Sequence, residues 1–242
     1  MRDMKEFYYL CSPYLPKEVR EILRSIGGRG FDIPECPRLA KPVAAHPDML
    51  FSELSDGTLL TEGKYFSENK AFFEGLPFYA KIKSSSTVLA PEYPRDVAFD
   101  VVRHRGAVIG KAEYMAEEIK RDAAAIIDVK QGYALCSVLK TERFAITADK
   151  HLCDALMDNN CETLFSSGSN IILNGYNCGF IGGASCCVEE TKTVVLFGNA
   201  EELLEFEKIK SFIEGFGYEL KYPKNIPLED FGGVKIVSEK VT

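Results

Sequence analysis

The feature of this sequence that most constrains its fold is an arrangement of loop, strand, turn and strand that recurs beside helical segments. Its clearest copy is the stretch NGYNCGFIGGASCCVEETKTVVLFGN, Asn174–Asn199. There Gly179–Gly183 indicates a loop whose backbone lies close to another segment, while Ala184–Val188 and Thr193–Phe197 are typical of strands joined by a polar turn. The recurrence of this arrangement predicts a fold assembled from similar units.

Two properties of the sequence bear on membranes and secretion. Residues Thr163–Val188 carry no formal charge, and by length alone they would suit a membrane-spanning helix. Their Gly, Ser and Asn content favours tight turns and weakens a lipid-facing helix, so we expect no membrane association. The N-terminal stretch MRDMKEFYYLCSPYLP has a short apolar run broken by Pro13, so we expect no signal peptide.

Composition narrows the class of protein further. A chain of 242 residues with 46% hydrophobic residues can bury a full core, as one domain or two small ones. The net charge of −7, without a Lys/Arg stripe, argues against a nucleic-acid partner. The eight cysteines form no C-x-x-C pair, which indicates neither a zinc site nor disulfides and predicts a reduced, cytoplasmic setting. No nucleotide-binding loop is present, and we expect no metal and no cofactor.

Two of the units match closely in sequence. His46-Pro47-Asp48 precedes a predicted strand at Met49–Leu54, and Tyr93-Pro94-Arg95-Asp96 precedes a predicted strand at Val97–Val102. Other predicted strands cover 7–11, 58–61, 78–83, 107–110, 134–139, 144–147, 163–166, 218–222 and 234–237. Helices are predicted at 16–26, 68–75, 114–125, 151–157 and 200–216, with Asp149 and Asn199 as N-caps of the last two.

These elements predict an α/β fold of five units that close into a ring. The approximate repeats are 13–63, 64–111, 112–148, 149–198 and 199–242, within one domain that covers 1–242. The fifth unit lacks one strand, and Phe7–Cys11 is a spare strand, so we expect Phe7–Cys11 to pair with Val234–Val237 and close the ring. The alternative is an open sheet of βαβ units, which would need only one strand for each helix.

The chain resembles the pentein fold, the five-bladed β/α propeller of the guanidino-group modifying enzymes. The resemblance rests on five strand–hairpin–helix units and on four motifs: HPDML at 46–50, YPRDV at 93–97, GFIGGAS at 179–185 and DFGG at 230–233. The same motifs resemble an uncharacterised bacterial pentein-like family without an assigned activity. The resemblance covers nearly the whole chain.

The resemblance implies a particular chemistry. In catalytic penteins, carboxylates clamp a guanidinium, a histidine moves protons and a cysteine near the C-terminus attacks the guanidino carbon. That cysteine follows a Gly-Gly pair after two further residues, and Ile236 occupies this position after Gly232-Gly233. Cys186 has the same spacing after Gly182-Gly183 in the fourth unit, which makes Cys186 and His46 the candidates for catalysis.

A ring of units would bring polar residues from all five loops to one channel mouth. The candidates for ligand binding are Asp48, Arg95, Asp96, Gln131, Asn177 and Asp230. We expect Asp48 and Asp96 to lie in one shared cavity because they hold matching places in adjacent units. The alternative is that these Asp residues only cap turns, as they commonly do.

Three functions remain open at this point. The first is binding of a small polar ligand with an amidino or guanidino group in the central channel. The second is a non-catalytic pentein that interacts with a protein partner or forms a homo-oligomer, and the third is a Cys-dependent hydrolase or transferase. Because no charge near Cys186 in the sequence would favour its thiolate, we expect Cys186 not to be a nucleophile.

Overall fold

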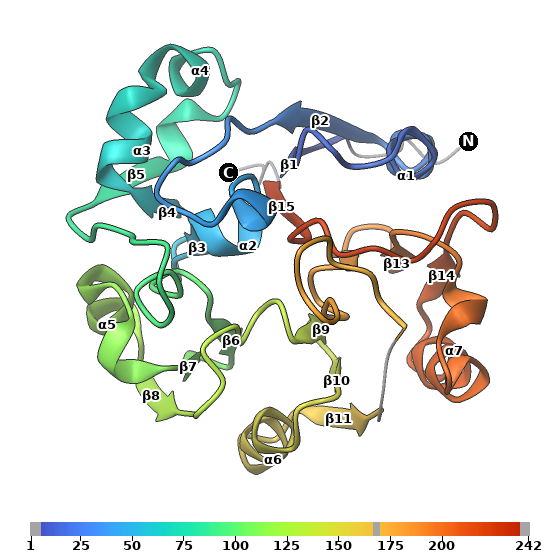
Figure 1. Ribbon diagram of the computed structural model, residues 1–242. Coiled ribbons are helices and arrows are strands. Elements are labelled where there is room, and N and C mark those ends of the chain that lie inside the picture. Colours follow the sequence, from blue (N-terminus) through green and yellow to red (C-terminus); the bar gives the residue numbers. More distant parts are fainter. Residues whose placement is uncertain (1–5, 167–169, 238–242) are drawn as a thin grey trace.

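The computed structural model describes residues 6–166 and 170–237, which form five three-stranded sheets. Figure 1 shows these sheets arranged around a common centre, with the longer helices at the periphery. The strand orders are β15-β1-β2, β3-β4-β5, β6-β7-β8, β9-β10-β11 and β12-β13-β14. The fold is therefore mixed α/β, built from several small sheets.

Each sheet combines an antiparallel pair with a parallel pair. In the second sheet, β3 (Phe51–Glu53) pairs antiparallel with β4 (Leu59–Glu62), and β4 pairs parallel with β5 (Ile82–Ser85). The third sheet contains β6 (Val102–His104), β7 (Ala107–Gly110) and β8 (Ala125–Asp128). The fourth contains β9 (Val138–Lys140), β10 (Phe144–Thr147) and β11 (Glu162–Phe165). The fifth contains β12 (Ser185–Val188), β13 (Thr193–Leu196) and β14 (Glu219–Lys221). Helices connect the two parallel strands, because a parallel pair needs a crossover.

The first sheet joins segments from the two ends of the chain. Strand β1 (Phe7–Cys11) is its central strand, with β15 (Val234–Val237) antiparallel on one side and β2 (Gly28–Asp32) parallel on the other. Tyr9 lies opposite Ile236 in one pair and opposite Gly30 in the other. The predicted pairing of Phe7–Cys11 with Val234–Val237 is confirmed.

Strand β2, which the sequence does not predict, depends on its glycines. A Cβ atom on Gly28 would lie 2.8 Å from the Phe7 ring, and one on Gly30 would lie 2.5 Å from the Tyr9 ring. The aromatic rings of β1 therefore lie across the glycines of β2. Cross-strand packing of this kind outweighs the low strand propensity of Gly.

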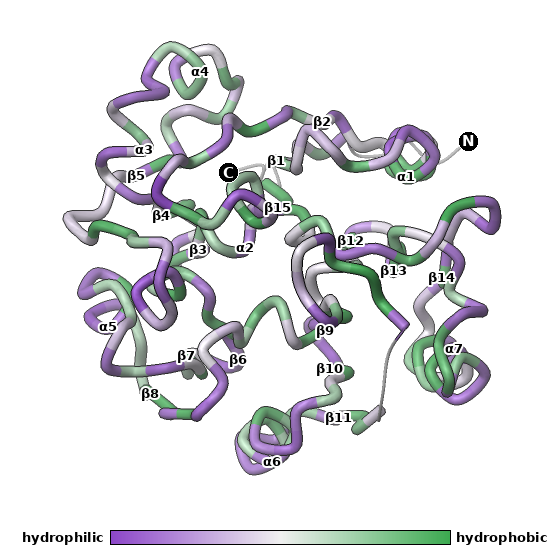
Figure 2. Tube along the Cα trace, viewed as in Figure 1, coloured by the Kyte–Doolittle hydropathy of each residue, from purple (hydrophilic) through white to green (hydrophobic). Residues whose placement is uncertain are grey.

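The α-helices of the described residues are α1 (Lys17–Ser25), α2 (Pro47–Leu50), α3 (Gly63–Glu68), α4 (Lys70–Glu74), α5 (Glu117–Asp122), α6 (Lys150–Asp158) and α7 (Phe206–Gly215). All four residues of α2 are buried near the centre, whereas the other helices lie further out and each bury one face against the sheets (Figure 1). Figure 2 shows hydrophobic and hydrophilic residues mixed along these peripheral helices, as expected for elements with one buried face. The predicted cap of α6 is confirmed, because the Asp149 carboxylate accepts a hydrogen bond from the Leu152 backbone N–H at 2.9 Å.

Several predicted boundaries are wrong, and three of them matter for the site. Residues 47–50 form helix α2 rather than the start of a strand, and β6 begins at Val102 rather than at Val97. Likewise β9 begins at Val138, although a strand is predicted from Ala134. Before β6 and before β9, the apolar residues of the predicted strand form a largely buried turn, and an apolar run alone does not distinguish a turn from a strand.

Within residues 6–166 and 170–237, no helix combines the length and the apolar character that a membrane crossing requires.

Candidate functional site

The segments that precede the inner strands bring three potential ligand side chains together at the centre of the molecule. Asp48 lies on α2, Asp100 just before β6 and Cys136 just before β9. One donor atom from each of the three lies within 4.8 Å of the others, and all three side chains are buried. Strands β3, β6 and β9 all lie close to the centre in Figure 1.

Two members of this cluster are held firmly. Asp100 Oδ1 accepts hydrogen bonds from the backbone N–H groups of Leu135 and Cys136, at 2.5 and 3.3 Å, and Oδ2 accepts one from Cys136 Sγ at 2.9 Å. Burial, and then the negative charge of Asp48, raises the pKa of Asp100 well above its usual range. Burial and the nearby carboxylates also raise the pKa of the Cys136 thiol, which therefore favours its protonated form.

Asp48 differs from its neighbours because its hydrogen-bonding capacity is unused. Its residue is 3% exposed, and neither carboxylate oxygen has a hydrogen-bond partner in the described part of the chain. His46 Nδ1 lies 4.0 Å from Asp48 Oδ1 and 3.8 Å from Asp230 Oδ1, too far for a hydrogen bond in either case. Burial lowers the pKa of His46 below its usual value despite the charge of Asp48. His46 is therefore a neutral imidazole between two carboxyl groups.

Asp230 fixes the loops of the fourth and fifth units to each other. Its Oδ2 accepts a hydrogen bond from the Phe180 backbone N–H, and its Oδ1 accepts one from the Gly232 N–H, both at 2.9 Å. Burial, followed by the charge of Asp48, raises the pKa of Asp230 to about 7. The predicted ligand-binding residue Asp230 thus makes structural hydrogen bonds through both oxygens.

Lys235 provides a positive group near this cluster. Its strand neighbours Val234 and Ile236 pack against one apolar cluster, whereas Val237 packs against another, so Lys235 lies on the Val237 face of the strand. Burial lowers the pKa of Lys235, and the charges of Asp48 and Asp100 oppose that shift. The amine is therefore a weaker base than an exposed lysine, and it lies within electrostatic range of both carboxylates.

The Gly182-Gly183 pair permits the close backbone approach that the sequence predicts for this loop. A Cβ atom on Gly182 would lie 2.2 Å from the Leu135 carbonyl oxygen and 2.6 Å from those of Cys136 and Val138. On Gly183 it would lie 2.0 Å from Asp230 Oδ1. The prediction that Gly179–Gly183 lies close to another segment is confirmed.

A second polar group lies around Asp96, which is 3% exposed. Its Oδ2 accepts a hydrogen bond from the Tyr133 hydroxyl at 2.7 Å, whereas Oδ1 is buried without a partner in the described residues. The Tyr133 ring lies 5.4 Å from the Tyr93 ring and 6.3 Å from the Phe180 ring, between centroids. Burial raises the pKa of Asp96, although the Tyr133 hydrogen bond opposes the shift.

The aromatic rings near Asp96 are accessible from outside. Tyr93 is 48% exposed and Tyr176 is 46% exposed. Burial, and then the charge of Asp96, raises the pKa of Tyr176. The Nζ atom of Lys111 already lies 5.8 Å from the centroid of the Tyr93 ring, a distance at which cations interact with aromatic faces.

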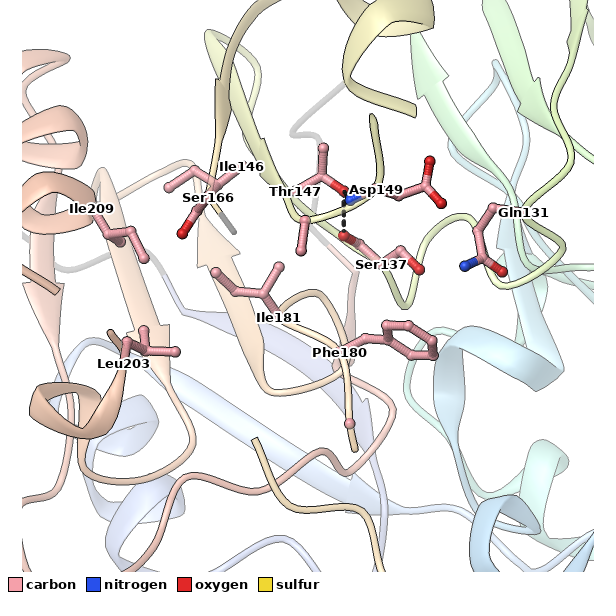
Figure 3. Close-up of a pocket in the computed structure, with 12 residues that line it drawn as sticks. Gln131, Ser137, Ile146, Thr147, Asp149, Ser166, Phe180, Ile181, Leu203 and Ile209 are labelled. Atoms are coloured by element: carbon pink, nitrogen blue, oxygen red, sulfur yellow. Dashed lines mark hydrogen bonds between the residues drawn. The ribbon is translucent and has the colours of Figure 1, made fainter. Parts of the chain in front are cut away.

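A small pocket lies between the fourth and fifth sheets, next to this aromatic group. Its volume is about 150 Å³, and Figure 3 shows the apolar side chains of Ile181, Leu203 and Ile209 on one side and Gln131 on the other. Gln131 Oε1 accepts a hydrogen bond from the Tyr133 backbone N–H at 3.1 Å, and Phe180 also lines the pocket. The pocket therefore adjoins Tyr133 through both of these residues.

The predicted ligand-binding residues differ in their exposure to solvent. Asp48, Asp96 and Asp230 are buried, whereas Arg95 and Asn177 are exposed. Arg95 does not hold Asp96, whose hydrogen bond comes from Tyr133. The shared cavity predicted for Asp48 and Asp96 stays a prediction.

Sequence reasoning missed four residues that surround these carboxylates: Asp100, Tyr133, Cys136 and Lys235. The signal for Asp100 and Cys136 is their matching place, two residues before β6 and β9 respectively. This signal becomes visible only when the first residue of each strand is known.

Cys186 is expected to behave as a buried apolar residue. It is 7% exposed, it packs in an apolar cluster that includes Tyr9 and Leu15, and burial raises the pKa of its thiol above the usual range. In the native protein, iodoacetamide should modify the exposed Cys178 first and leave Cys186 unmodified near neutral pH, as mass spectrometry of peptides would show. Rapid modification of Cys186 that an amidino compound blocks would contradict this expectation.

The arrangement of sheets and helices is a pentein-like fold, and two solved enzymes share it. A solved amidinotransferase, SxtG from Microseira wollei in the saxitoxin biosynthetic pathway, is similar with a TM-score of 0.58 and 12% identity, over 93% of this chain and 80% of that one. A dimethylarginine dimethylaminohydrolase, solved as an adduct with 4-chloro-2-hydroxymethylpyridine, is similar with a TM-score of 0.56 and 9% identity, over 91% and 92% of the two chains. At these identities the likeness concerns the fold alone.

The chain belongs to a family of unknown function (DUF6873), whose model matches residues 10–235. No curated protein matches the chain.

Proposed function

We propose that this protein binds a small organic cation with an amidino or guanidino group, at a site formed by Asp96 and the surrounding aromatic rings. The observation that carries the proposal is the buried Asp96 Oδ1, which lacks a hydrogen-bond partner among the described residues. A charged acceptor in this state is costly unless a donor reaches it. A ligand that supplies an N–H group to this oxygen would remove the cost.

The neighbouring rings favour a planar cation over a simple ammonium ion. Amidinium and guanidinium groups pair with carboxylates through fixed N–H groups and also stack on aromatic faces. The Tyr133 hydroxyl donates a hydrogen bond to Asp96, and the Tyr133 ring lies 5.4 Å from the partly exposed Tyr93 ring, so aromatic faces lie close to Asp96. The likeness in fold to enzymes that act on amidino and methylated guanidino compounds supports the same ligand class.

The proposal includes a closed five-bladed propeller, with the Asp96 site at the mouth of its central channel. The pairing of β1 with β15 supports closure, because it links the first and last units in one sheet. Binding is proposed here without a nucleophilic cysteine, since Ile236 occupies the expected position and packs against apolar residues.

The proposal predicts a dependence on the charge of the ligand and on Asp96. Arginine and agmatine should raise the melting temperature, whereas citrulline, which replaces the guanidinium with a neutral urea group, should not. Asp96→Asn should weaken binding by roughly tenfold or more, because a charge-assisted hydrogen bond contributes about 1.5–3 kcal/mol. Glu21→Gln, an exposed change on α1, is the matched control and should bind normally. Equal shifts with arginine and citrulline would refute the proposal.

The same site predicts a pH dependence of ligand affinity. The cation binds the ionised form of Asp96, so affinity should fall as the pH decreases through the raised pKa of that group. Tyr133→Phe removes the hydrogen bond that lowers this pKa, and the midpoint of the fall should move to higher pH. Isothermal titration of agmatine at a series of pH values measures both midpoints. A midpoint that the substitution leaves unchanged would exclude Asp96 as the titrating group.

A further inference from the structure

The cluster of Asp48, Asp100 and Cys136 has the composition of a metal site rather than of a structural network. It places two carboxylates and one thiol with donor atoms within 4.8 Å of one another, and all three residues are buried. The three residues come from three separate units, so the fold itself brings them together. Asp96, which accepts a hydrogen bond from Tyr133, is not one of these three residues.

Asp48 gives the independent evidence for a missing partner. Its residue is 3% exposed, and both of its carboxylate oxygens lack a hydrogen bond in the described residues. Burial of an ionised carboxylate without hydrogen bonds or a paired charge costs several kcal/mol. Lys235 lies within electrostatic range, but neither Asp48 oxygen is hydrogen-bonded to it. The fold thus leaves a buried carboxyl group, without a hydrogen bond among the described residues, close to Asp100 and Cys136.

We propose that Asp48, Asp100 and Cys136 bind a divalent transition-metal ion of the zinc class. Zinc accepts carboxylate oxygens at roughly 2.0–2.2 Å and thiolate sulfur at roughly 2.3 Å, commonly with three protein ligands and one open position. Donors at such bond lengths lie roughly 3.5 Å apart in a tetrahedron, so a small inward movement of the side chains completes the site. Magnesium and calcium fit less well, because they favour ligand sets made only of oxygen.

Binding of the ion displaces protons from its ligands. The Cys136 thiol donates a hydrogen bond to Asp100 Oδ2 at 2.9 Å. As the sulfur–metal bond forms, the thiol proton leaves to the solvent, and so does the carboxyl proton in molecules in which Asp100, whose pKa is raised, is protonated. Asp100 Oδ2 then becomes free to coordinate the ion. No oxidant, reductant or further reactant takes part.

Cobalt is the probe that reports on the sulfur ligand directly. Chelator-treated full-length protein titrated with Co²⁺ should develop a thiolate-to-cobalt charge-transfer absorption band that saturates at one ion per chain. An excess of Zn²⁺ should then remove the band. Absence of the band, with protein that is folded by circular dichroism, would overturn the proposal.

Substitutions distinguish Co²⁺ binding at this cluster from Co²⁺ binding at other thiols, and from binding of an organic cation at Asp96. Cys136→Ser should abolish the band, whereas Cys178→Ser, at an exposed cysteine, should keep it. If Cys136→Ser does not fold, Asp48→Asn serves instead, because no protein hydrogen bond is lost, and it should weaken Co²⁺ binding by about tenfold or more. Asp96→Asn should leave Co²⁺ binding unchanged, so failure of the organic-cation proposal is distinguishable from failure here. A band that survives Cys136→Ser would overturn the assignment.

Discussion

A chain that lacks residues 1–12 is expected to lose its cooperative thermal unfolding transition altogether. This deletion removes β1, the central strand of its sheet, and leaves β2 and β15 without a partner between them. It also removes four core side chains, those of Phe7, Tyr9, Leu10 and Cys11. Each large apolar side chain contributes about 1.5–3 kcal/mol by burial, and the lost total approaches the net stability of about 5–15 kcal/mol of a whole domain.

The matched control is a chain that lacks only residues 1–5, which retains β1 complete. Differential scanning calorimetry or circular dichroism should show one sharp transition for the control and a gradual, non-cooperative change for the longer deletion. If the chain without residues 1–12 melts in a sharp transition close to that of the control, then β1 is dispensable and the pairing with β15 does not hold the fold together.

Gly182→Ala is expected to destabilise the protein by about 3 kcal/mol or more, near the upper end for overpacking. The new Cβ would lie within 2.6 Å of three backbone carbonyl oxygens, those of Leu135, Cys136 and Val138. Backbone atoms at the start of β9 cannot move aside as a flexible side chain can, so the fourth sheet, which contains β9, and the fifth sheet, which contains β12, must separate. The free energy of unfolding from urea denaturation measures the effect.

Gly215→Ala is the matched control for this substitution. Gly215 ends helix α7, and a Cβ atom there would meet nothing within 4 Å. Alanine favours the helix over glycine, so this variant should be neutral or more stable by up to about 1 kcal/mol. Equal stability of the Gly182→Ala and Gly215→Ala variants would show that the loop before β12 can relax, contrary to the packing described.

Strands with β-branched or aromatic residues and clear ends were predictable from the sequence. Phe7–Cys11, Ala107–Gly110, Phe144–Thr147 and Val234–Val237 have the predicted bounds. Strand β2 was not predictable from its own residues, because the sequence GRGFD has no strand pattern. Its stability depends instead on packing against the aromatic rings of β1, which a local sequence pattern does not reveal. In such segments, tertiary packing determines whether a strand forms.

The motifs at 46–50 and 93–97 indicate Asp48 and Asp96, whereas Asp100 was not predictable from the sequence. The motif at 93–97 pointed to Asp96, yet β6 begins five residues after Val97, which places Asp100 next to Cys136 at the centre. A strand that begins five residues later than predicted places different side chains at the site, because the loop before the strand sets its register. Tyr133 was missed for another reason: its hydroxyl contact with Asp96 crosses between units, and one sequence carries no record of such a contact.

The place of β1 between β2 and β15 has a consequence for biosynthesis. The ribosome makes β1 well before β15, so one edge of β1 lacks its partner while the residues between the two strands are made. At roughly 5–20 residues per second this interval lasts on the order of tens of seconds. During the interval, that edge of β1 exposes unpaired backbone groups to other nascent chains or to chaperones. Strand β1 therefore acquires its full set of hydrogen bonds only after β15 has been made.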